Sequence, residues 1–353
     1  MPLRVLILGA SYGSLLASKL LTAGHGVRLV CLPPEAQRMN ADGFRVQMPV
    51  KGRDGLVEID SRALPGEMSA GAPGDFDPAD FDLVTLAMQE PQYRSPGVRE
   101  LMERIAKIGA PCMSIMNMPP LPYLKRIPGL DVDACRDCYV DPALWDPFDR
   151  ASMTLCSPDP QAVRVPGAKD NVLRVGLATN FKAARFDGEA PTALLRRLEA
   201  DIDAVRLVLA GEPIAVPVRL RVHESVFVPL AKWPMLLTGN YRCVQRDTVR
   251  SIQEAVHSDI DASRAVYQWV VDLCRSLGAQ PTDLVPFEKY AQAATSLVNP
   301  ASVARALVGG ARDVERVDRL VQVIAGQKGL RSAPVDQIVS WVDGWLESNR
   351  RRA

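Results

Sequence analysis

The sequence of 353 residues has almost no excess of charge and no long apolar run. Its 42 Lys and Arg residues balance 41 Asp and Glu residues, and a net charge of +1 argues against nucleic acid or an anionic membrane as a partner. No apolar stretch approaches the roughly 18 residues that a membrane-spanning helix needs. The N-terminus lacks the basic start and apolar stretch of a signal peptide. We therefore expect a soluble cytoplasmic protein.

Histidine and cysteine are too scattered to indicate a metal site or a disulfide framework. The three histidines, His25, His223 and His257, have no partners in the sequence that suggest a catalytic triad or a metal site. The seven cysteines are an odd number spread through a long chain. Cys135 and Cys138 form a C-x-x-C pair, but no second pair or nearby histidine completes a zinc site. We interpret both as ordinary loop thiols.

The N-terminal part of the chain has an α/β pattern. Apolar residues 4–8 predict a buried strand that ends at Gly9, leucines at helical spacing follow, and residues 27–31 predict a second strand. A strand, a glycine turn, a helix and a strand within about 30 residues form a βαβ unit. Residues 81–87 and 111–116 predict two more strands, so we expect a doubly wound sheet.

The pattern becomes helical from about residue 222 onward. We predict an α/β fold, an N-terminal Rossmann doubly wound sheet followed by an all-α C-terminal domain. The first domain would cover residues 1–221, with insertions near 60–80 and 118–170. Residues 222–353 would form a helical substrate and dimerisation domain, because apolar C-terminal helices favour a homodimer. Helices are expected at residues 190–209, 248–278, 285–297, 300–308, 313–328 and 334–349.

The turn after the first strand is a candidate nucleotide-binding loop. Its sequence is Gly9-Ala10-Ser11-Tyr12-Gly13-Ser14, one residue shorter between its outer glycines than the usual G-x-G-x-x-G pattern. Glycines here let backbone N–H groups approach a pyrophosphate at the positive end of the following helix. We expect Gly9 to make the tight turn and Gly13 to allow close packing of the helix on the strand. A structural turn in a flavodoxin-like domain is the alternative.

The end of the second strand bears on the choice between NAD and NADP. A carboxylate there would accept a hydrogen bond from the ribose 2′-hydroxyl group and would repel a 2′-phosphate. The sequence Cys31-Leu32-Pro33-Pro34 offers no acid, Glu35 comes slightly late, and Arg38 is one helical turn further on. The pattern favours NADP, with Arg38 as a candidate phosphate partner and NAD as the alternative.

The sequence contains further motifs at residues 6–30, Met116-Asn117-Met118, Ala231-Lys232-Trp233 with Gly239-Asn240, Asn299-Pro300-Ala301-Ser302 and Arg312-Asp313-Val314-Glu315. Together they resemble those of the ketopantoate reductase (2-dehydropantoate 2-reductase) family, in the group with 6-phosphogluconate-dehydrogenase-like helical C-terminal domains. The resemblance covers most of the chain. It implies an enzyme that reduces a 2-keto acid with NADPH and holds this small-molecule substrate between a Rossmann domain and a helical domain.

The resemblance also implies roles for individual residues. Lys232 falls on the family's catalytic lysine and Asn117 on an asparagine near the nicotinamide. Substrate-binding positions of the family match Asn240, Ser302 and Asp313, or Glu315 if the gap is placed differently. As structural alternatives, Asn117 would be a turn residue, Asn240 a helix C-cap, and the others residues at helix N-termini.

Two polar positions of the family differ in this sequence. The first asparagine of the family's helix is Leu236, and the lysine after the third strand is replaced by Met88 or Gln89. The aromatic-rich residues 139–148 could also line a larger pocket. Together, these features predict that ketopantoate is a poor substrate and that a bulkier carbonyl compound or its alcohol is preferred. An opine- or imine-type dehydrogenase and a catalytically silent NADPH-binding regulator are the alternative functions.

Elementary chemistry supports the role of Lys232. A ketone gains negative charge on its oxygen as a hydride arrives, and a cation or proton donor within hydrogen-bond reach lowers that barrier. Lys232 lies among apolar residues, so burial is expected to lower its pKa. A lysine that snorkels from an amphipathic helix is the structural alternative. On an ideal helix Asn240 would lie about 80° from Lys232, within one face, although Pro234 intervenes.

Overall fold

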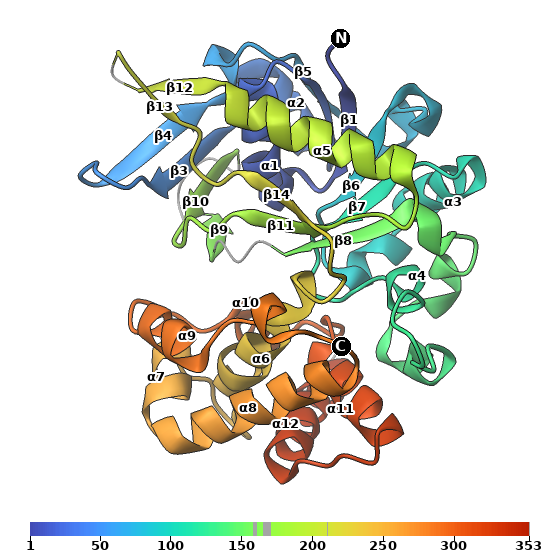
Figure 1. Ribbon diagram of the computed structural model, residues 1–353, viewed down its shortest axis with the longest axis vertical. Coiled ribbons are helices and arrows are strands. Elements are labelled where there is room, and N and C mark those ends of the chain that lie inside the picture. Colours follow the sequence, from blue (N-terminus) through green and yellow to red (C-terminus); the bar gives the residue numbers. More distant parts are fainter. Residues whose placement is uncertain (158–160, 165–170, 210, 353) are drawn as a thin grey trace. The chain divides into compact units, whose positions relative to one another are not determined.

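The computed structural model describes residues 1–157, 161–164, 171–209 and 211–352. The chain divides into two compact units. The first comprises Met1–Met88, Gln92–Tyr123 and Leu144–Glu224, and the second comprises Gln89–Pro91, Leu124–Ala143 and Ser225–Ala353. Two segments within the predicted first domain therefore belong to the second unit. The predicted fold class, a doubly wound sheet followed by helices, is confirmed (Figure 1).

An eight-stranded sheet forms the centre of the first unit. Its order is β14-β11-β8-β7-β6-β1-β2-β5, and neighbouring strands are parallel except for β8 and β11. The strands are β1 Arg4–Leu8, β2 Gly26–Val30, β5 Met68–Gly71, β6 Leu83–Leu86, β7 Cys112–Ser114, β8 Met153–Ser157, β11 Phe181–Ala184 and β14 Leu220–His223. Strands β2 and β5 lie on one side of β1, and the strands from β6 onward in the sequence lie on its other side. The switch point of the sheet therefore lies between β1 and β6.

A smaller sheet and a hairpin complete the strands described in the first unit. The smaller sheet has the order β4-β3-β10-β9, and β12 pairs with β13. These strands are β3 Arg45–Pro49, β4 Leu56–Asp60, β9 Ala162–Arg164, β10 Val172–Val175, β12 Arg206–Leu209 and β13 Glu212–Ala215. The predicted helix at 190–209 is wrong at its end, because the β-branched and leucine side chains of β12 pair with β13. Helix α5 accordingly ends at Ala204.

The helices described in the first unit flank the two sheets (Figure 1). They are α1 Ala10–Thr22, α2 Pro33–Asp42, α3 Val98–Ile108, the single turn α4 Leu121–Leu124 and α5 Glu189–Ala204. The last residue of α4 belongs to the second unit. Helix α1 contacts β1 and β2 of the large sheet and also β3 and β10 of the smaller one. Because α1 packs against two sheets, 11 of its 13 residues are buried.

One of the buried residues of α1 is a lysine. The side chain of Lys19 has an exposed fraction of 0%. The hydroxyl groups of its neighbours Ser18 and Thr22 donate to helix carbonyl oxygens at 2.8 and 2.6 Å, as buried polar groups require. Among the described residues, the polar contact of Lys19 Nζ is instead the Sδ atom of Met48 on β3, at 4.0 Å. The α1 helix thus encloses an amine without a carboxylate partner at hydrogen-bond distance in the described structure.

The regular elements described in the second unit are helices. Its α-helices are α6 Trp233–Met235, α7 Ile252–His257, α8 Ile260–Ser276, α9 Phe287–Ala294, α10 Ser302–Val308, α11 Val317–Gln327 and α12 Ala333–Arg351. The helix predicted at 248–278 is divided in two, because Asp259 caps the N-terminus of α8 by accepting from the Ala262 amide at 2.9 Å. None of the described helices is both long enough and apolar enough to cross a membrane.

Candidate functional site

The glycine loop lies between β1 and α1, as the sequence predicts. Gly9 precedes the helix with φ +107°, a conformation that residues with a Cβ rarely adopt. A Cβ at Gly9 would lie 2.6 Å from Cγ of Met88 and 2.7 Å from the carbonyl oxygen of Ala87, just after β6. A Cβ at Gly13 would overlap Cγ2 of Ile7 on β1. Gly9 is therefore required by its conformation and by packing, and Gly13 by the close approach of α1 to the sheet.

The first turn of α1 is suited to hold an anion. The first N–H groups of a helix have no intrahelical acceptor, and the positive end of the helix dipole lies there. Gly9 has no side chain that could cap them. The hydroxyl group of Ser14 donates to the carbonyl oxygen of Ser11 at 2.8 Å and so turns away from the loop's N–H groups. The loop Gly9–Gly13 therefore fits the pyrophosphate group of a dinucleotide.

Arg164 reaches this loop although no motif in the sequence indicates it. It is the last residue of β9, and its Nε donates to Oγ of Ser11 at 3.0 Å. Its guanidinium group also forms an ion pair with the carboxylate of Glu35 in the first turn of α2. Arg38, the phosphate partner considered from the sequence, lies on α2 and is half-buried. A pairing between distant strands brings Arg164 here, so a local sequence pattern could not have found it.

Asn117 lies at the same edge of the large sheet as the glycine loop. It comes three residues after Ser114, the last residue of β7, and is half-buried. Strands β1, β6 and β7 are parallel neighbours, so their carboxyl ends meet at one edge. Open α/β sheets bind ligands at this edge. The predicted position of Asn117 after a buried strand is confirmed, and its contact with a ligand stays a prediction.

Lys232 lies in an irregular helical run of the second unit. The run consists of the 3₁₀ turn η8 Pro229–Lys232, α6, the π-helical turn η9 Leu236–Asn240 and the 3₁₀ turn η10 Tyr241–Cys243. The exposed fraction of Lys232 is 7%. This burial disfavours the alternative in which the lysine snorkels into solvent. Stretches of π-helix occur frequently at functional sites.

The π-helical turn changes the geometry expected for Asn240. Its i→i+5 hydrogen bonds wind the chain more widely than an α-helix does, so the predicted angle of about 80° from Lys232 does not apply. Asn240 is half-buried, and the helical run continues beyond it to Cys243, so Asn240 does not cap a helix end. The turn is packed by Tyr290, whose hydroxyl group donates to the carbonyl oxygen of Met235 at 3.1 Å. A Cβ at Gly239 would overlap this hydroxyl group.

Ser302 and Asp313 lie further along the second unit. Ser302 is exposed and is the first residue of α10. Asp313 precedes α11 by four residues, so the expected position at a helix start is wrong; the helix begins after Arg316. Oδ1 of Asp313 accepts from Nη2 of Arg350 at 2.9 Å. The Asp313 carboxylate thus already has a cationic partner on α12.

Glu315 is the buried carboxylate of the same segment. Its exposed fraction is 6%, and its Oε1 accepts from the backbone amide of Glu90 at 3.4 Å. Glu90 is also buried, and its carboxylate accepts from the amide of Val140 at 3.2 and 3.3 Å. Tyr241, which directly follows Asn240, donates its hydroxyl proton to the carbonyl oxygen of Glu315. The structure therefore links Glu315 directly to the helical run of Lys232.

The cysteine pair lies in the 3₁₀ helix η5 Asp133–Cys138, and the side chains of both cysteines are buried. Burial raises the pKa of the Cys135 thiol to about 11 and that of Cys138 to about 12. Reactive thiols instead have a lowered pKa, so the interpretation as structural thiols agrees with this environment. In the part of the chain that the structure describes, no cluster of three or more His, Cys, Asp or Glu residues could hold a metal ion.

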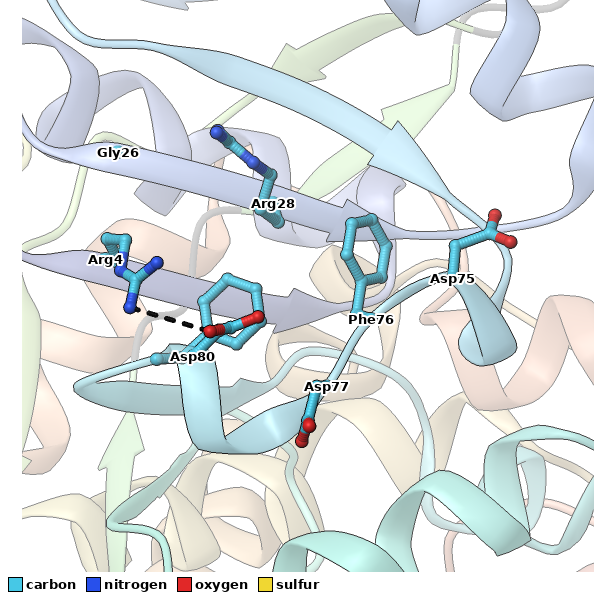
Figure 2. A pocket seen from close by; sticks show the side chains of 8 residues that line it. Arg4, Gly26, Arg28, Asp75, Phe76, Asp77 and Asp80 are labelled. Carbon is cyan, nitrogen blue, oxygen red and sulfur yellow. Dashed lines mark ion pairs between the residues drawn. The ribbon is translucent and has the colours of Figure 1, made fainter.

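Two small cavities lie away from the glycine loop. The cavity in Figure 2 has a volume of about 150 Å³ and is lined by residues that include Arg4, Arg28, Phe76 and Asp80. Arg4 starts β1 and pairs with Asp80 at 3.8 Å, so this cavity lies near the amino end of that strand. The second cavity, about 190 Å³, is lined by residues of α8, α11 and α12 with the segment before α12. Neither is lined by a predicted site residue.

Solved structures share this fold over the whole chain. The first unit has the architecture of dinucleotide-binding domains, with its glycine loop at the carboxyl end of β1. A 2-dehydropantoate 2-reductase from Methylococcus capsulatus is 10% identical, with a TM-score of 0.66 and coverage of 98% of this chain and 97% of that chain. A ketopantoate reductase from Ralstonia eutropha JMP134 is 15% identical, with a TM-score of 0.64 and coverage of 98% and 99%.

A third solved structure is a D-mandelate dehydrogenase in a ternary complex with NADH and anilino(oxo)acetate. It is 12% identical, with a TM-score of 0.63 and coverage of 98% of this chain and 99% of that chain. No protein-family model and no curated protein matches the sequence. At these identities the likeness concerns the fold, and it confirms the expected resemblance to ketopantoate reductases at that level.

Proposed function

We propose that the protein is an NADP-preferring oxidoreductase that transfers a hydride between the nicotinamide and the carbonyl or hydroxyl carbon of a small molecule. The full-length likeness to reductases and a dehydrogenase supports this proposal. The fit of the Gly9–Gly13 loop to a pyrophosphate supports a dinucleotide. The observation that carries the proposal is the burial of Lys232, because a cation shielded from water stabilises negative charge on a substrate oxygen more strongly than one at the surface.

The bound nicotinamide would supply the hydride, and the chain would supply the groups that stabilise the charge. Lys232 would polarise or protonate the substrate oxygen as negative charge develops there. Its apolar surroundings strengthen this interaction, because water screens it less than at the surface. Asn117 and Asn240 would orient the substrate through their amide groups. Asp313, which pairs with Arg350, and the buried Glu315 are the two candidate acidic residues of this site.

We further propose a substrate that is bulkier and less polar than ketopantoate. Leu236, with an exposed fraction of 5%, opens the π-helical turn, and Met88 packs against Gly9. Both are apolar where the family has hydrogen-bonding side chains, so a polar substrate group would lose partners worth about 1–3 kcal/mol each. The solved D-mandelate dehydrogenase holds a ligand with an aryl group beside its oxoacid, which supports aryl-bearing 2-keto acids as the class.

The aromatic-rich residues 139–148 do not contribute to this argument. The side chains of Tyr139, Trp145 and Phe148 have exposed fractions of 5%, 1% and 4%. The ring of Trp145 packs edge-on against that of Tyr93, with the centroids 5.9 Å apart. These aromatic residues belong to the cores of the units, which leaves little of their surface for a substrate.

The experiment that tests the proposal compares Lys232→Ala with Lys289→Ala, a matched control at an exposed position on α9. With the best 2-keto acid of a panel, Lys232→Ala should lower kcat by about 10² or more. The Kd for NADPH should change less than about threefold, and the control should behave as the wild type. Near-wild-type turnover of Lys232→Ala would remove Lys232 from the mechanism.

Two outcomes would favour other functions. NADPH binding by the wild type without turnover of any substrate would favour a regulator, and oxidation of NADPH that requires an added amine would favour an imine-type dehydrogenase. The homodimer stays a prediction, which light scattering of the purified protein would measure.

A further inference from the structure

Ser11, Glu35 and Arg164 form a charged cluster beside the glycine loop, within the first unit. Arg164 donates from Nε to Oγ of Ser11 at 3.0 Å and from Nη2 to the carboxylate of Glu35. Strand β9 brings Arg164 here because it pairs with β10, which pairs with β3, and both β3 and β10 contact α1. The cluster therefore depends on the small sheet.

The cluster lies at the end of β2. Cys31 follows this strand directly, and the pKa of its thiol is raised to about 12, chiefly by burial and also by the carboxylate of Glu35, while the guanidinium group of Arg164 opposes the rise. Glu35 lies in the first turn of α2, four residues after Cys31, and its ion pair places Arg164 beside it. In a doubly wound sheet, the adenosine ribose of a dinucleotide is recognised at the end of the second strand. This is the position at which a 2′-hydroxyl group is distinguished from a 2′-phosphate.

The exposure of the two charged side chains decides which of them a ligand meets. The side chain of Glu35 is 11% exposed and that of Arg164 is 43% exposed. An arginine has five N–H donors in a planar fork that matches phosphate oxygens. Within the described residues, Nε and Nη2 of Arg164 are engaged by Ser11 and Glu35, and Nη1 makes no hydrogen bond. The accessible charge is thus the cation, and Glu35 lies beneath it.

We propose that Arg164 binds the 2′-phosphate of NADP(H) and so sets the coenzyme preference, with Glu35 holding the guanidinium group in place. This inference rests on the proposed function, which supplies the coenzyme. The carboxylate of Glu35 would otherwise repel a 2′-phosphate, but its ion pair with Arg164 balances its charge. Ser11, where the usual fingerprint has a glycine, provides the second anchor through its hydroxyl group.

The test measures the Kd of NADPH and of NADH for three variants by calorimetry. Arg164→Gln should raise the Kd of NADPH about tenfold to a hundredfold, the scale of one hydrogen bond to a charged group, and change that of NADH less than threefold. Glu35→Gln keeps a hydrogen-bond acceptor but removes the negative charge, so it should leave NADPH binding as tight or tighter. Arg174→Gln is the matched control, because Arg174 is an exposed arginine on β10 that contacts Gln47.

The other outcomes separate this inference from the proposed function. If the wild type binds neither coenzyme, the proposed function fails and the inference fails with it. If Arg164→Gln weakens NADPH and NADH equally, Arg164 serves the pyrophosphate shared by both coenzymes, and its role in preference is wrong. If Glu35→Gln weakens NADH alone, Glu35 accepts from the ribose hydroxyl groups, which also contradicts the inference. Circular dichroism of each variant would establish that it is folded.

Discussion

Replacing Lys19 by methionine should stabilise the protein at neutral pH. Lys19 is fully buried in α1, between the large sheet and β3 of the small sheet, and its Nζ lies 4.0 Å from the sulfur of Met48. Burial lowers the pKa of its amine from 10.5 to about 7. Methionine has a similar length and no charge, so it can fill the same space without the cost of removing an ammonium group from water.

The magnitude follows from the pKa. A fall from 10.5 to about 7 is a difference of about 3.5, and one unit corresponds to about 1.4 kcal/mol. At pH 7 the amine therefore costs up to about 5 kcal/mol of folding free energy. Between pH 7 and 10.5 the unfolded chain binds one more proton than the folded chain, so the wild type gains stability as the pH rises, by about 1.4 kcal/mol per unit. The advantage of Lys19→Met should shrink at this rate and vanish near pH 10.5.

Urea unfolding at several pH values between 7 and 10 measures this difference. Hydrogen exchange of peptides from α1 would assign the transition to the first unit. Lys107→Met is a matched control, because Lys107 is exposed on α3, and it should change the unfolding free energy by no more than about 0.5 kcal/mol at every pH. A stability difference for Lys19→Met that does not depend on pH would refute the reasoning, as would a variant less stable than the wild type at pH 7.

Three further predictions concern the loop, the π-helical turn and the substrate. Gly13→Val should destabilise the protein by about 1–3 kcal/mol, because the valine side chain would overlap Ile7. It should also raise the Kd of the coenzyme, measured by calorimetry, at least tenfold. An unchanged Kd in a folded variant would contradict the assignment of the loop as the coenzyme site. Gly239→Ala should lower the Tm, and adding Tyr290→Phe should restore part of the loss; no recovery would mean that the hydroxyl group is not the obstacle. The kcat/KM should be higher for aryl 2-keto acids than for ketopantoate, and a preference for ketopantoate at about 10⁴ M⁻¹ s⁻¹ or more would support the plain family assignment.

The centre of the fold could be predicted because its signals are local. Strands β1, β2, β6 and β7 are short and mostly apolar, which is typical of buried parallel strands. Strand β5 lacks this signal, because Met68–Gly71 consists mostly of small residues at the edge of the sheet. Its parallel pairing with β2 stabilises it, and no local pattern encodes that pairing.

The residues of the candidate site could likewise be predicted where their signal is local in the sequence, and not where it is not. The glycine loop and Lys232 could be found because each lies in a motif that is continuous in sequence. Arg164 and Glu90 could not, because strand pairing in one unit and contacts between distant segments in the other bring them into place. The π-helical turn has no sequence signature of its own; the packing of Tyr290 on Gly239 accompanies it.

The helical unit is not continuous in the sequence. The chain passes from one unit to the other between residues 88 and 89, 91 and 92, 123 and 124, 143 and 144, and 224 and 225. A recombination event that exchanged only residues 225–353 would keep the old Glu90, with its contact to the Val140 amide, and place a foreign residue at position 315 beside the Glu90 amide. A single crossover at residue 225 would therefore transfer only part of the helical unit, because residues 89–91 and 124–143 of that unit precede it in the chain.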